Sequence, residues 1–252
     1  MLHRDDYTAA IDDLVALCHG LSHVEALVAV YIAGSVARGD FTAGRSDIDA
    51  YVVCTDAVEE VRRELSAGIA AIVSQRLPEL AALVAEPISL AITTMEEIQL
   101  GHSFLGVGFE YHNFTTTAKL ILGTDVRSHI RKPSRQEERL TARTALKAIC
   151  EDHSPRTGDI VGESDVYQLF STVFRAAAIF LCGQGTYVSG KQETTTALVK
   201  RFAGQDERLC SLVQSAFESW REWGARPLTA GQHRCLSASC EEFIRCLSRH
   251  AL

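Results

Sequence analysis

The pattern of hydrophobic and polar positions changes in character near residue 132. Before that point, short apolar runs typical of strands alternate with amphipathic stretches typical of helices. The strands are predicted at residues 26–33, 47–54, 87–94 and 119–123, and the helices at residues 6–20, 56–77 and 95–101. Beyond it, apolar residues recur at helical spacing, which predicts five helices at residues 134–152, 160–182, 189–203, 206–222 and 230–250.

These patterns predict an α+β chain of two domains. The first, residues 1–132, is expected to be a mixed sheet flanked by helices. The second, residues 133–252, is expected to be an all-α helical bundle. A chain of 252 residues is long enough to build two hydrophobic cores.

Composition narrows the class of protein without identifying a function. Hydrophobic residues make up 46% and charged residues 23% of the chain, as in ordinary globular proteins. No apolar stretch approaches the roughly 20 residues of a membrane helix, and the acidic N-terminus lacks an apolar signal core. The eight cysteines form no CxxC pair, so we interpret them as reduced thiols. We therefore expect a cytoplasmic protein with no membrane partner.

Charge divides unevenly along the chain. Residues 1–125 carry 7 Lys/Arg and 18 Asp/Glu, whereas residues 126–252 carry 18 Lys/Arg and 14 Asp/Glu. Two solvated surfaces of different composition would suffice as an explanation, and the alternative is an acidic half that holds cations and a basic half that holds anions. The dense basic stripe of a duplex-binding protein is missing, so we expect no nucleic-acid partner.

A Gly-Ser pair followed by two aspartates carries the clearest chemical signal. Gly34 and Ser35 end one apolar run, and Asp47 and Asp49 open the next. Residues two apart in a strand share a face, so these carboxylates lie about 7 Å apart along it and repel when ionised. Mg²⁺ between them removes that repulsion, and it prefers one or two carboxylates with substrate phosphates. Gly34 lets a phosphate approach the backbone, where Ser35 can donate to it.

Such a phosphate cradle beside a metal pair is what nucleotidyl transfer needs. The alternative is an exposed strand start behind a plain turn. The segment GSVARGDFTAGRSDIDAYVV (34–53) resembles the signature of the DNA-polymerase-β-like nucleotidyltransferases. The helical second half narrows the resemblance to the aminoglycoside nucleotidyltransferases, especially the streptomycin/spectinomycin adenylyltransferases. LILGTDVR (120–127) and VFRAAAIFLCGQGTYVSGK (173–191) are similar to the segment before that family's bundle and to its helix, turn and lysine.

The resemblance implies roles for individual residues. Gly34, Ser35 and Ser46 would surround and contact the nucleotide triphosphate. Asp47 and Asp49 would bind Mg²⁺ and carry the catalysis. The fold implied for the first domain is that of a polymerase-β-like nucleotidyltransferase, with ATP as co-substrate.

Three further residues have two interpretations each. Lys191 would reach the phosphates, or it is a solvated lysine at a helix start, where the helix dipole disfavours a cation. Asp165 lies where the family places an acidic residue that meets its cationic drug, or it is a helix N-terminal cap. Arg38 either assists the phosphates or forms a structural salt bridge.

One departure from the family concerns its third carboxylate. The family carries an acidic residue on the next core strand, and here the matching position is Ser89, in EPISLAITT. The general base then comes from elsewhere, or catalysis is impaired. Glu86 is close in sequence but is expected on the opposite strand face unless Pro87 bends the chain. Glu110, in GFEYHNF, could line a cleft, and its alternative is a solvated loop residue.

The sequence therefore predicts a Mg²⁺-dependent adenylyltransferase. It would move AMP from ATP to a hydroxyl of a small molecule, and the acidic cleft favours a cationic acceptor such as an aminoglycoside, which would make it an antibiotic-resistance enzyme. One alternative is a catalytically weak nucleotide-binding module with a regulatory or antitoxin-like role, favoured by Ser89. Another is nucleotidylation of a protein side chain. Either a monomer or a homodimer is compatible with the sequence.

Overall fold

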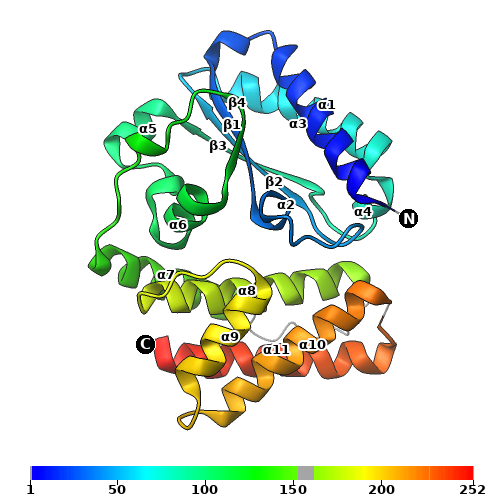
Figure 1. Cartoon of the computed structure of the whole chain (residues 1–252), viewed down its shortest axis with the longest axis vertical. Helices are drawn as coiled ribbons and strands as arrows, with labels where there is room; N and C mark the ends of the chain where they lie inside the picture. Colours follow the sequence, from blue (N-terminus) through cyan, green and yellow to red (C-terminus); the bar gives the residue numbers. More distant parts are fainter. Residues whose placement is uncertain (1, 153–161, 227, 252) are drawn as a thin grey trace. The chain divides into compact units, whose positions relative to one another are not determined.

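The chain divides into two compact units, each described here by itself. The computed structural model describes residues 2–152, 162–226 and 228–251. The units are Met1–Lys132 and Pro133–Leu252 (Figure 1). The first contains a sheet with helices and the second is all-helical among its described residues, which confirms the predicted fold class.

The first unit is built on a four-stranded mixed sheet. The strands are β1 (Leu27–Ala33), β2 (Ile48–Cys54), β3 (Ile88–Thr94) and β4 (Lys119–Gly123), in the spatial order β3-β2-β1-β4. Strand β1 is antiparallel to β2 and β4, while β2 and β3 are parallel. The helices are α1 (Arg4–His19), α2 (Gly34–Arg38), α3 (Val58–Arg76), α4 (Pro78–Ala81), α5 (Met95–Leu100) and α6 (Gly108–Thr117). Three short 3-10 turns are η1 (Val24–Ala26), η2 (Phe104–Gly106) and η3 (Arg127–His129).

The two faces of this sheet pack against different helices. In Figure 1, α1 and α3 lie on one side of the sheet and α5 and α6 on the other. Strand side chains alternate between faces, so Ile48 and Ala50 point to one side while Asp49 and Tyr51 point to the other. Tyr51 belongs to the core formed with Phe114 of α6. The face that carries Asp49 is therefore the face that α6 covers.

Helix α6 is the main element that the hydrophobic pattern does not predict. Its sequence, GFEYHNFTTT, has a glycine, three threonines and aromatic residues, all of modest helix propensity. Fully buried Phe114 anchors it, with its ring 4.6 Å from that of Tyr31. Tertiary packing thus overrides propensity in this segment, and the solvated-loop interpretation of Glu110 is wrong.

The second unit consists of five helices in its described part. They are α7 (Arg135–Asp152), α8 (Glu163–Gly183), α9 (Lys191–Phe202), α10 (Glu207–Ala225) and α11 (Ala230–Ala251), close to the predicted ranges. Helix α8 forms the centre of this core, because most of its residues from Val173 onward are buried. By length and composition, this helix could span a membrane. However, 67% of its most apolar 18-residue stretch is buried inside the protein, as in the core helix of a globular unit.

Candidate active site

Gly34 places the start of α2 directly against the carboxylate of Asp49. Ala33, the last residue of β1, pairs with Asp49 across the antiparallel ladder, and the next residue, Gly34, turns the chain with φ +64°. A Cβ on Gly34 would collide with Asp49 Oδ2. Two constraints therefore require glycine at position 34. The backbone is left-handed there, and the Asp49 carboxylate occupies the space that a side chain would fill. The predicted closeness of the Gly-Ser turn to the aspartates is therefore seen in the fold.

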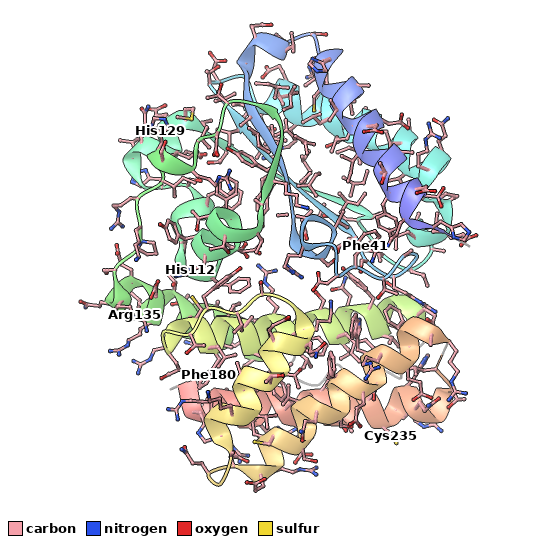
Figure 2. The ribbon with its side chains drawn as sticks, viewed as in Figure 1. Phe41, His112, His129, Arg135, Phe180 and Cys235 are labelled. Carbon is pink, nitrogen blue, oxygen red and sulfur yellow. The ribbon has the colours of Figure 1, made fainter. Side chains whose placement is uncertain are left out.

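The loop that leads to the aspartates is held by a buried tyrosine of α1. Tyr7 Oη donates to the carbonyl of Ser46 (2.7 Å) and accepts from the amide of Gly44 (3.1 Å). Its ring packs on Phe41, which Figure 2 labels, at 4.7 Å between ring centroids. Burial, opposed in part by these backbone hydrogen bonds, raises the pKa of Tyr7 to about 12. Tyr7 stays neutral and fixes the loop, a role that the sequence pattern did not reveal.

Ser46 has a structural role in this loop. Its hydroxyl accepts a hydrogen bond from the amide of Thr42 (3.1 Å), and its side chain is buried. That bond closes the turn from Thr42, as a serine commonly does. The Ser46 hydroxyl already accepts this hydrogen bond, and its contact with the nucleotide stays a prediction.

Asp47 and Asp49 flank buried Ile48, and both are partly exposed. Asp47 directly precedes β2, and Asp49 lies within it. In the described chain no group of three His, Cys, Asp or Glu side chains could hold a metal by itself. Two carboxylates with the glycine cradle nevertheless fit Mg²⁺, because this ion takes few protein ligands and completes its shell with phosphate and water oxygens.

Ser89, at the position where the resemblance implies a third carboxylate, is in register with Asp49. In the parallel ladder of β2 and β3, Asp49 pairs with Ser89 and Ile48 with Ile88. Ser89 therefore shares the face of Asp49. Glu86 is exposed and lines a hollow of about 690 Å³ with Ile88, Leu90 and residues of α3 and α4. That hollow is on the opposite side of the sheet, so the structure argues against Glu86 as the base.

Glu110 is a carboxylate that the fold brings to the Asp49 face, through a hydrogen bond to Tyr51. Tyr51 Oη donates to Glu110 Oε2 (3.2 Å) and accepts from Nδ2 of Asn113 (3.3 Å). Burial raises the pKa of Tyr51, and the charges of Glu110 and Asp49 add to that rise. A neutral tyrosine hydroxyl thus links the two carboxylates electrostatically. The sequence pattern did not single out Tyr51 as a site residue. Its position two residues after Asp49, which places it on the same strand face, is the signal that could have identified it.

Ser35 and Arg38 lie on the short helix α2. The carbonyl of Ser35 accepts hydrogen bonds from the amides of Gly39 (2.9 Å) and Asp40 (3.2 Å), which close the helix. Arg38 Nε lies 3.2 Å from Asp40 Oδ1, within ion-pair distance but without hydrogen-bond alignment. This pair favours the salt-bridge interpretation of Arg38, while the Ser35 hydroxyl keeps its predicted role as a phosphate donor.

Lys191 and Asp165 belong to the helical unit. Lys191 is the first residue of α9, and its Nζ lies 4.9 Å from the ring centroid of Trp220 and 5.9 Å from that of Phe174. A positive charge at a helix N-terminus is disfavoured by the helix dipole, and these cation–π contacts offset that cost. Asp165 Oδ2 accepts from the amide of Gly162 (3.1 Å) at the N-terminus of α8, which is the capping arrangement.

Comparison with known proteins agrees with this geometry. Residues 21–100 match the nucleotidyltransferase domain family, a range that includes β1, the aspartate loop, β2 and β3. No curated protein matches the chain. Among solved structures, the spectinomycin adenyltransferase AAD(9) from Enterococcus faecialis with ATP and spectinomycin is similar in fold, with a TM-score of 0.60 and 10% sequence identity. That match covers 95% of this chain and 98% of the other. The chain therefore contains a polymerase-β-like nucleotidyltransferase domain, and the region that follows it is all-helical in its described part.

Proposed function

We propose that this protein transfers AMP from ATP to a hydroxyl of a small cationic molecule, with an aminoglycoside as the first acceptor to test. The observation that carries the proposal is the packing of the Gly34 turn against Asp49, which places the backbone at the start of α2 beside the Asp49 carboxylate. The bound ATP and spectinomycin of the similar solved structure support the choice of nucleotide and acceptor class.

Each residue of the site would act by binding or orienting. Asp47 and Asp49 would hold Mg²⁺, which when bound supplies charge neutralisation at the reacting phosphate. The amides at the start of α2 and the Ser35 hydroxyl would hold the triphosphate. In the transfer, the acceptor oxygen bonds to the α-phosphorus, the bond to the β-phosphate oxygen breaks, and pyrophosphate leaves. Lys191 would contribute a positive charge to the leaving phosphates.

The proton of the acceptor hydroxyl needs a base, and we assign that role to Glu110. It is the carboxylate that Tyr51 holds on the Asp49 face. The hydrogen bond from Tyr51 to Oε2 orients this carboxylate, which would take the proton. A base must come within hydrogen-bond reach of the hydroxyl, which requires the acceptor to bind over α6.

A second candidate is a nucleotide-binding module with little turnover. The specific observation in its favour is Ser89, which faces Asp49 where the family has a carboxylate. In this case ATP would bind and stabilise the protein, but no acceptor would release pyrophosphate. Nucleotidylation of a protein side chain, the third possibility, would use the same residues as the first.

The decisive experiment measures pyrophosphate release from the purified protein with Mg²⁺. Each nucleoside triphosphate is combined with a panel of aminoglycosides that includes spectinomycin and streptomycin. We expect release with ATP that depends on an acceptor, and its loss in Asp47→Asn/Asp49→Asn. The matched control is Asp5→Asn/Asp12→Asn, two exposed aspartates of α1, which removes the same charge and should keep the activity. ATP binding without release for any acceptor would favour the second candidate.

A further inference from the structure

A small hollow in the helical unit is lined by arginines of one helix face. It measures about 270 Å³ and is bordered by α7, the end of α8 and the end of α11. Its lining residues are Arg139, Ala142, Arg143, Leu146, Phe180, Gly183, Gln184 and His250. The four α7 residues are spaced at i, i+3, i+4 and i+7, so they form one stripe on that helix. Figure 2 labels Phe180 and Arg135 at the same end of the helical unit.

The neighbouring carboxylates are already engaged with other partners. Buried Glu138 is paired with Arg135, which also donates to the carbonyl of Cys182. Asp206 Oδ2 lies 2.9 Å from His250 Nε2. Within the described residues, neither Arg139 nor Arg143 forms an ion pair or a side-chain hydrogen bond. Both guanidinium groups therefore remain available to a ligand.

The charge around the hollow stays positive after the helix ends are counted. The C-termini of α8 and α11 each contribute about half a negative charge, while the two arginines contribute two positive charges. The two guanidinium groups thus outweigh the helix ends at the wall of the hollow by about one charge, and the carboxylate of Asp206, which contacts His250 but does not line the hollow, opposes them. The alternative explanation is that Arg139 and Arg143 only neutralise the helix ends and Asp206, and the titrations below distinguish the two.

We propose that this hollow, with Arg139 and Arg143 on its rim, is a binding site for a small phosphate-class anion. Guanidinium forks match the oxygens of phosphate, and two of them one helical turn apart suit an anion with more than one charge. The volume of about 270 Å³ lies just under the roughly 300–1,000 Å³ of sites for drug-sized ligands, which suits a small anion such as inorganic phosphate or pyrophosphate. None of the residues that line this hollow is among those proposed above to hold the nucleotide.

The test measures binding of inorganic pyrophosphate and inorganic phosphate by calorimetry, with the full chain in EDTA to exclude metal-dependent binding. Arg139→Gln/Arg143→Gln is expected to raise the pyrophosphate Kd by at least about tenfold, because it removes two charge-assisted contacts. The matched control, Arg221→Gln/Arg234→Gln, removes two exposed arginines that lie outside the hollow and should change Kd less than about twofold. A local readout is the imidazole NMR signal of His250, assigned with His250→Asn, which should shift on titration.

Four results would overturn the proposal. They are the absence of saturable binding, an equal loss in both arginine pairs, and malonate binding as tight as pyrophosphate. The fourth is binding lost in Asp47→Asn/Asp49→Asn but kept in Arg139→Gln/Arg143→Gln, which would assign the anion to the nucleotide site. Thermal unfolding without anion shows that each variant is folded.

Discussion

Gly34→Ala is the substitution that tests the geometry of the site most directly. Gly34 has φ +64°, and an added Cβ would collide with Asp49 Oδ2 and come within 3.1 Å of its Cγ. The Asp49 carboxylate is the end of a side chain, so it can rotate away while the strand stays in place. We therefore expect the variant to fold with a displaced metal ligand.

The cost to stability follows from the backbone and the rotamer. Alanine in the left-handed region costs about 1–2 kcal/mol, and an off-rotamer aspartate costs about 0.5–1.5 kcal/mol. In a chain of this size each kcal/mol lowers Tm by about 2–4 °C. A nucleotide at a hundred times its Kd stabilises the wild type by about 2.7 kcal/mol, and Gly34→Ala should lose most of that stabilisation.

The control is Gly204→Ala in the helical unit. Gly204 has φ +72°, and its added Cβ would meet nothing within 4 Å, so this variant carries the backbone strain without the collision. Thermal unfolding is recorded for both variants with and without ATP and Mg²⁺. We expect both melting temperatures to fall, and only Gly204→Ala to keep the nucleotide-dependent rise. An equal rise in Gly34→Ala would show that the position of Asp49 against the turn has no part in binding.

Three further predictions concern other residues of the two units. Lys191→Met should weaken ATP binding more than AMP binding in parallel titrations, since its partner would be a β- or γ-phosphate; equal losses would contradict this. Tyr7→Phe should cost about 1–3 kcal/mol in urea unfolding, because it removes two hydrogen bonds. Burial raises the pKa of Tyr7 to about 12. The contribution of Tyr7 to stability is therefore complete below about pH 10 and is lost as the pH rises toward 12. Tyr7→Phe should accordingly lose stability less steeply than the wild type in that pH range. Glu110→Gln should lower turnover by about 10²–10⁴ with nucleotide affinity kept, whereas Glu86→Gln should not; if wild-type turnover is near background, Ser89→Asp should raise it.

The hydrophobic pattern predicts the elements whose local signals agree with their environment. Strands β1, β2 and β3 are apolar runs bounded by turn residues, and the five helices of the second unit have apolar stripes at helical spacing. Helix α6 shows no such agreement. The hydroxyls of Thr115, Thr116 and Thr117 donate to carbonyls one turn earlier, and the buried Phe114 secures the helix. Its existence depends on the sheet beneath it, which no local pattern contains.

The candidate site divides in the same way. Gly34, Asp47 and Asp49 are predictable, because a turn and a strand of period two suffice to bring them together. The contact of Tyr51 with Glu110 joins residues 59 positions apart, and only the packing of α6 on the sheet creates it. Ser89 is intermediate, since the resemblance implies its position on the next core strand, while its pairing with Asp49 is seen only in the ladder.

The register of β2 couples the chemistry of this site to the hydrophobic core. Ile48 and Ala50 are fully buried on one face, while Asp49 faces Gly34 and Ser89 on the other. A slip by one residue would move the apolar pair to the site and bury the carboxylate, which costs several kcal/mol for an unpaired charge. The burial that stabilises β2 therefore also fixes where Asp49 lies. For this reason, substitutions of Ile48 should change nucleotide binding together with stability, although its side chain points away from the site.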